Sequence, residues 1–64
     1  MRDYNASKEA LKQALFQRGH TEIENFLDYQ IDPDEDKDVT DKRLDMAIDQ
    51  MSPRDFWDAV ARYC

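Results

Sequence analysis

A chain of 64 residues is long enough for one small domain, and a domain of this size buries only about 60 % of the surface that its unfolded chain exposes. Hydrophobic residues make up 41 % of the chain and charged residues 38 %, which is apolar enough to form a core and excludes an obviously disordered protein. The net charge of −6 opposes binding to nucleic acid or to an anionic membrane surface, and it favours a basic protein partner.

The chain has no apolar run of the roughly 18 residues that a bilayer span needs, and its first residues lack the hydrophobic core of a signal peptide. Its single cysteine, Cys64, cannot form an intramolecular disulfide. We therefore expect a cytoplasmic protein that makes no membrane contact.

The first predicted helix covers residues 7–18, with Asn5 or Ser7 as its N-cap and Gly19 as the left-handed residue that ends it. Its spacing of apolar residues predicts one buried stripe, with Lys12 outside it. The residues of that stripe are Ala10, Leu11, Ala14 and Leu15.

The second predicted helix covers residues 21–31 and begins with Thr21-Glu22-Ile23-Glu24, which matches the S/T-x-x-E capping box. Two helices joined by a short turn suggest a helix-turn-helix DNA reader. This helix, however, carries three carboxylates and no Lys or Arg, so phosphates would repel it and direct nucleic-acid binding is not expected. Its apolar face is predicted to contain Ile23, Phe26, Leu27 and Ile31.

The segment 32–38 is the predicted acidic loop. Its alternating aspartates match the first three ligand positions of a calcium-binding EF-hand loop. The sixth position is Lys37, where glycine is needed, and the twelfth is Arg43, where a bidentate glutamate belongs. We therefore expect a solvated loop and no metal site.

The third predicted helix covers residues 40–51, with Thr40 as its cap. Leu44, Ala47, Ile48 and Met51 are expected to face the core.

A row of aspartates follows one side of this third helix. Asp41, Asp45 and Asp49 recur every four residues, and Asp38 extends the row if the helix begins slightly earlier. Like charges at this spacing each cost on the order of 0.2–0.5 kcal/mol, so replacing the three aspartates by asparagine is expected to raise stability. Lys42 is expected to offset part of the repulsion. One interpretation is an ordinary solvated face, and the other is a binding surface for a basic partner.

The last predicted helix covers residues 53–63, with Ser52 as N-cap and Pro53 at the first helical position. It divides cleanly into a polar and an apolar side. The apolar side contains Phe56, Trp57, Val60, Ala61, Tyr63 and Cys64. Replacement of Phe56 or Trp57 by alanine is expected to cost about 3–5 kcal/mol.

Together these patterns predict an all-α fold, a single domain over residues 1–64 of about four short helices packed as an orthogonal or irregular bundle. No nucleophile lies at a recognisable spacing from a base, and a single glycine cannot build a phosphate-binding loop, so neither an enzyme nor a cofactor is expected. His20 and Cys64 provide too few ligands for zinc.

The expected function is that of a small acidic binding module or inhibitor. It would regulate a larger protein with a basic surface, and Asp38, Asp41, Asp45 and Asp49 are the candidate partner-binding residues. One alternative is a nucleic-acid mimic that blocks a DNA- or RNA-binding protein. Others are a structural subunit of an assembly and a homodimer formed through an apolar patch.

Overall fold

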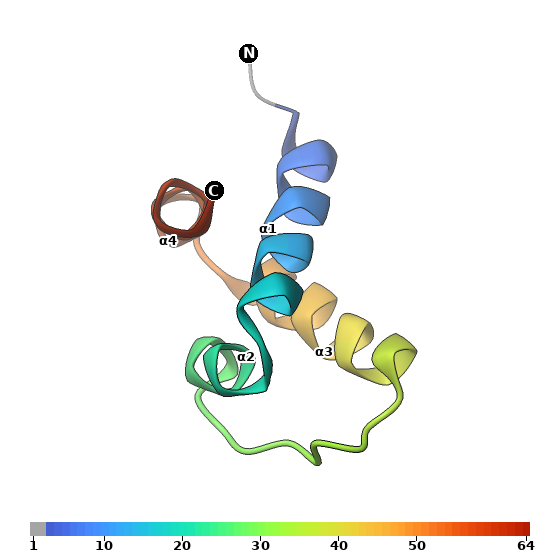
Figure 1. The fold of residues 1–64 in the computed structure, drawn as a ribbon. Coiled ribbons are helices and arrows are strands. Elements are labelled where there is room, and N and C mark those ends of the chain that lie inside the picture. Colours follow the sequence, from blue (N-terminus) through green and yellow to red (C-terminus); the bar gives the residue numbers. More distant parts are fainter. Residues whose placement is uncertain (1–2) are drawn as a thin grey trace.

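The computed structural model describes residues 3–64, which form four α-helices and no β-strand. The helices are α1 (Tyr4–Arg18), α2 (His20–Leu27), α3 (Lys37–Gln50) and α4 (Pro53–Tyr63). α1 packs against each of the other three helices, and α2 also packs against α3. Figure 1 shows α4 nearly end-on beside α1, so these two helices are inclined to each other rather than parallel. The prediction of an all-α fold with about four short helices is confirmed.

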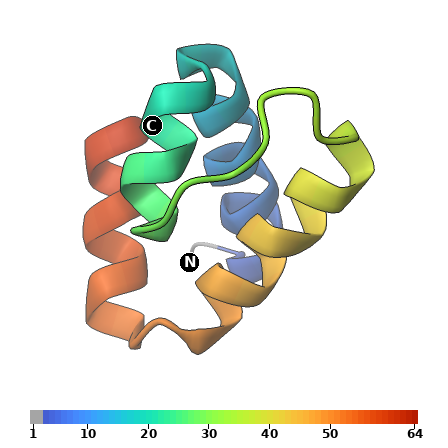
Figure 2. The same cartoon turned by 90° about the horizontal axis from the view of Figure 1, so that it is seen from below.

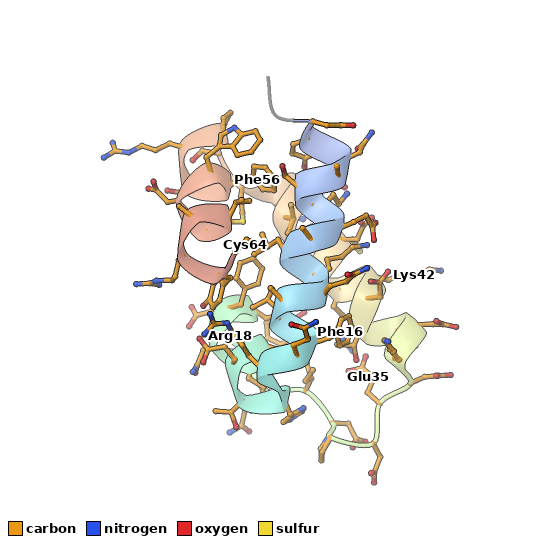
Figure 3. All side chains as sticks on the ribbon, turned by 45° about the horizontal axis from the view of Figure 1, so that its top comes forward. Phe16, Arg18, Glu35, Lys42, Phe56 and Cys64 are labelled. Carbon is orange, nitrogen blue, oxygen red and sulfur yellow. The ribbon has the colours of Figure 1, made fainter. Side chains whose placement is uncertain are left out.

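The core takes two residues from each helix, and the two are four positions apart in every case. This spacing places both side chains on one face of their helix. Figure 3 shows the Phe56 ring lying between α4 and α1, where it contacts the ring of Tyr4 at 4.8 Å between centroids. The buried apolar residues are Leu11, Leu15, Ile23, Leu27, Leu44, Ile48, Phe56 and Val60.

Several positions differ from the predicted burial. Ala10, Ala61 and Cys64 are exposed, and Trp57 is half-buried against the core. Lys12 was expected outside the apolar stripe but is buried. Apolar periodicity does not anticipate this lysine, because its burial depends on what the neighbouring helix supplies.

α1 begins three residues earlier than predicted. Asp3 is the N-cap, and its side chain accepts a hydrogen bond from the backbone N–H of Asn5 at 3.0 Å. Asn5 and Ser7, the predicted caps, therefore lie inside the helix. Gly19 ends α1 at the predicted position and with a positive φ of +107°, but its ψ of 179° differs from the predicted left-handed helical conformation. Its N–H donates to the Leu15 carbonyl at 3.2 Å.

α2 is shorter than predicted, and the capping-box prediction at Thr21 is wrong. Gly19 is the N-cap of α2 as well as the C-cap of α1, which puts His20 in the first position of α2. The predicted capping box fails because the Glu24 carboxylate accepts from the N–H of Ile31 at 2.9 Å and from no backbone group at the helix start. Asp28 ends the helix in the left-handed conformation.

α3 starts at Lys37, three residues before the predicted start, and ends at Gln50. Thr40 is not its cap: it is buried, and its hydroxyl donates to the Asp36 carbonyl at 3.4 Å. The early start places Asp38 in the first turn of the helix, as the row of aspartates requires. The connecting segment therefore spans residues 28–36 and bridges the end of α2 and the start of α3 (Figure 2).

α4 has the predicted range, and its N-cap is Ser52 as predicted. The Ser52 side chain accepts from the backbone N–H of Asp55 at 3.2 Å, and Pro53 takes the first helical position.

Candidate functional site

The predicted row of aspartates on α3 faces two lysines of α1. Lys8 Nζ lies 2.8 Å from Asp45 Oδ1 and 2.8 Å from Asp49 Oδ1. Lys12 Nζ lies 3.2 Å from Asp41 Oδ2 and 3.3 Å from Asp45 Oδ1. Two lysines one turn apart on α1 therefore bridge three aspartates one turn apart on α3, with Asp45 shared between them.

Lys12 is the buried member of this cluster, with 5 % of its side chain exposed. Its amine also contacts Glu9 Oε1 at 3.0 Å. Burial works against the charged amine, but the hydrogen bonds to Glu9, Asp41 and Asp45 leave the pKa of Lys12 above its ordinary value. The aliphatic stem is buried, and the charged end reaches the aspartates.

Lys8 and Tyr4 hold the other end of the row. The hydrogen bonds to Asp45 and Asp49 raise the pKa of Lys8. The hydrogen bond from Lys8 is the main cause of the lowered pKa of Asp45. A second hydrogen bond from Lys8, together with one from the Tyr4 hydroxyl, lowers the pKa of Asp49. The Tyr4 hydroxyl donates to Asp49 Oδ1 at 3.0 Å. The charged forms of Asp45 and Asp49 are therefore the stabilised forms.

This cluster corrects the interpretation of the row as locally unfavourable. Lys42 was expected to relieve the repulsion, but Figure 3 shows it pointing away from the other helices, and it forms no ion pair among residues 3–64. The relief comes from Lys8 and Lys12 on α1. Three of the four candidate partner-binding residues thus have partners inside the chain, although Asp41, Asp45 and Asp49 keep 44 %, 42 % and 53 % of their side chains exposed.

Asp38, the fourth candidate, differs from the other three. It is exposed in the first turn of α3, and it has no ion pair within the described part of the chain. A carboxylate in the first turn also interacts favourably with the helix dipole. Asp38 is therefore the candidate that is free to meet a partner.

Negative charge is concentrated in the segment 28–38, which we call the acidic segment. It holds six carboxylates and one lysine, which gives 1 − 6 = −5 of the chain's net −6. Lys37 lies over the Phe16 ring at 5.3 Å, and Glu35 is bonded to Arg43. The remaining carboxylates are exposed and have no ion pair among residues 3–64. They belong to Asp28, Asp32, Asp34, Asp36 and Asp38.

The polar contacts of the acidic segment are few. The Asp32 side chain accepts from the N–H of Asp34 at 2.9 Å, which shapes the turn. Glu35 points from the loop toward the helices (Figure 3), and its Oε1 accepts from Arg43 Nε while its Oε2 is buried without a hydrogen bond. One contact with α3 therefore anchors the middle of this segment.

The residues considered for chemistry are dispersed. His20 Nε2 lies 3.1 Å from Glu24 Oε2, and Cys64 is an exposed free thiol. Over residues 3–64, no three His, Cys, Asp or Glu side chains are grouped so that they could hold a metal ion. None of the helices in that range has the length and apolarity to cross a membrane.

Sequence reasoning did not identify an apolar stripe on the outer side of α3. Val39 and Met46 are seven residues apart on one stripe of the helix and are 45 % and 63 % exposed. Tyr29, just beyond α2, is also 48 % exposed. The spacing of Val39 and Met46 is a signal that the sequence contains, but it has meaning only once α3 is known to begin before residue 39.

Comparison with known proteins does not assign this chain to a family. No family model matches it, and no curated protein or solved structure matches it. A functional proposal for this chain therefore depends on its own residues.

Proposed function

We propose that this protein is a small acidic binding module that regulates a larger protein by docking on its basic surface. The single observation that carries the proposal is the separation of charge described above. Asp41, Asp45 and Asp49 of the α3 row have lysine partners in the chain, whereas the acidic segment, which includes Asp38, presents exposed carboxylates that do not.

Such a segment has a defined physical effect on association. A concentrated patch of one sign attracts an oppositely charged surface over a distance of about a Debye length, roughly 8–10 Å at physiological salt. This attraction raises the rate of encounter more than it raises final affinity. An inhibitor or regulator that must find its partner quickly gains from this arrangement.

The proposed binding surface is centred on the acidic segment and the start of α3, rather than on the whole aspartate row. Asp38 belongs to both the row and the acidic segment, so it links the two. Asp41, Asp45 and Asp49 remain candidate contacts through their exposed halves, in a secondary role, because a partner's cation would compete there with Lys8 and Lys12. The nucleic-acid mimic is less well supported, since a mimic needs the carboxylates of the row to be available.

The experiment is to capture the partner from the native host and to measure its association with variants. The first variant combines Asp32→Asn, Asp34→Asn and Asp38→Asn, which keeps side-chain size and removes three charges. We expect association with the partner to slow about tenfold or more at low salt and to become less sensitive to salt, with little change in thermal stability. A control variant with Asp55→Asn and Asp58→Asn removes two exposed charges from α4 and should have a smaller effect for each charge removed.

Unchanged association for the first variant would refute the proposal. Equal slowing for each charge removed in the two variants would show that net charge matters and the acidic segment does not. The mimic makes a separate demand, because the parent protein must then compete with labelled nucleic acid for the partner. Simultaneous binding of both would exclude the mimic.

A further inference from the structure

The polar and the apolar flank of α3 differ in how far the rest of the chain covers them. On one flank the polar aspartate row is covered in part by Lys8 and Lys12 of α1. On the other flank Val39 and Met46 are left with about half of their surface in water. The flank that is chemically suited to water is the one that has partners, and the apolar flank is open.

Tyr29 is held beside this open flank. Asp28 ends α2 at a φ of 68°, a conformation that aspartate tolerates better than most residues, and the chain turns there. Arg43 of α3 then reaches back: its Nη1 lies 3.5 Å from the Tyr29 hydroxyl, and its guanidinium lies 5.9 Å from the ring centroid. Because Arg43 also pairs with Glu35, it contacts two residues of the acidic segment, Tyr29 at its start and Glu35 in its middle.

A hollow of about 280 Å³ lies between these side chains, at the junction of the end of α2 and the middle of α3. Its size suits one or two side chains rather than a cofactor. The residues that line it are Leu27, Tyr29, Arg43, Met46, Ala47 and Gln50.

The composition of this surface is that of a protein interface. Tyr, Met and Arg are enriched at the centre of interfaces, and methionine adapts its shape to an incoming side chain. Single exposed apolar residues are ordinary on protein surfaces. Here Tyr29 and Met46 line one hollow, Val39 lies on the same stripe of α3 as Met46, and Tyr29 belongs to the acidic segment.

We propose that the hollow beside Tyr29 and Met46 receives an apolar side chain of a basic partner segment, whose Lys or Arg residues face the acidic segment. The inference rests on the proposed function, since it names the contact through which the same basic partner is held. Charge complementarity selects this occupant. A second copy of the chain would place two segments of charge −5 against each other, which opposes self-association.

The probe is the peptide acetyl-Lys-Lys-Leu-Phe-Lys-Lys-amide, with two matched peptides. One replaces Leu-Phe by Ser-Ser and keeps the charge, and the other replaces every lysine by glutamate and keeps the anchor. Binding is followed by ¹H–¹⁵N chemical shifts. We expect saturable shifts at Tyr29, Met46 and Ala47 with the first peptide, about fivefold or more weaker binding without the anchor, and none with the acidic peptide.

Protein variants locate the contact. Val39→Thr combined with Met46→Gln keeps side-chain size and removes apolar surface at exposed positions, so the fold should persist, and this is checked by circular dichroism. We expect the double variant to lose the preference for the anchored peptide. Ala61→Ser on the exposed side of α4 is the control and should bind as the parent does.

The possible outcomes separate the two proposals. Equal binding of the anchored and anchor-free peptides, or unchanged preference in the double variant, overturns the hollow as the contact. Concentration-dependent dimerisation that the double variant abolishes would also overturn it, because a second copy would then be the occupant. If Asp32→Asn with Asp34→Asn leaves all binding unchanged while the double variant abolishes the preference, the hollow stands and the acidic segment fails as the docking surface.

Discussion

Lys12 provides the sharpest test of the cluster between α1 and α3. Replacing it by methionine keeps an unbranched apolar stem of similar length and removes the amine that contacts Glu9, Asp41 and Asp45 at 3.0–3.3 Å. Removing one member of a buried charge pair destabilises a protein, because the remaining charges lose their compensation. Replacing both members by apolar residues does not have this cost. We therefore expect Lys12→Met to lower the free energy of unfolding.

The magnitude follows from the exposure of the carboxylates. A hydrogen bond between fully buried charged groups contributes about 1.5–3 kcal/mol, whereas an exposed pair contributes about 0–1 kcal/mol. The three carboxylate side chains are 42–63 % exposed, which places each pair near the lower range. At about 0.5 kcal/mol for each pair, the total loss is about 1.5 kcal/mol, and the melting temperature of a domain of this size falls by roughly 6–12 °C.

The assay is urea unfolding of the parent and of four variants. Lys42→Met is the matched control, because Lys42 is exposed and has no ion pair among residues 3–64, and it should change stability by less than about 0.5 kcal/mol. Asp45→Asn, alone and combined with Lys12→Met, completes a double-mutant cycle with an expected coupling of about 0.5 kcal/mol. If Lys12→Met is as stable as the parent, or if both lysine variants lose the same stability, the structural role of the row is refuted.

Three further predictions concern the core, the turn and pH. Phe56→Ala should cost about 3–5 kcal/mol and unfold most of the domain, whereas Trp57→Ala, at a half-buried position, should cost clearly less; melting curves that coincide would contradict this order. Gly19→Ala meets no neighbouring atom within 4 Å, so its cost of about 1–3 kcal/mol should come from the backbone at φ +107° and ψ 179°; a melting temperature equal to that of the parent would refute this reasoning. Folding lowers the pKa values of Asp45 and Asp49, so these carboxylates stabilise the fold fully above the unfolded pKa near 3.9 and lose that contribution as pH falls through the folded pKa values. The free energy of unfolding of the variant Asp45→Asn with Asp49→Asn should therefore fall less steeply than that of the parent between about pH 5 and pH 2. Equal slopes would argue against the pairs.

The pairing of the row also reverses an expectation about asparagine. From the sequence, neutralising Asp41, Asp45 and Asp49 was expected to raise stability by removing repulsion within α3. With Lys8 and Lys12 across from them, the same replacement removes attractive contacts and leaves a lysine buried, so stability should fall. The sign of this change in urea unfolding distinguishes the two interpretations directly.

Much of the fold follows from local sequence. Apolar residues four apart define the inner face of every helix, and Ser52-Pro53 and Gly19 mark boundaries because their own side chains or backbones determine the local conformation. Element type and core membership were therefore predictable for residues such as Leu15, Leu44 and Phe56. Thr21 and Thr40 were misread, since a capping pattern competes with other partners for the same groups, and these partners are recognised only after the chain has folded.

The candidate site depended on tertiary structure to a greater degree. The sequence shows the four-residue spacing of the aspartates, but the lysines that face them lie 29 to 41 residues away in the chain. A charge pattern within one helix reports only repulsion along that helix, whereas the net interaction is determined by which helix packs beside it. The packing of α1 on α3 decided that Lys12 is buried and that the aspartate row has partners. It left Val39, Met46 and Tyr29 on the open flank, because the interior of a chain this short cannot enclose every apolar side chain.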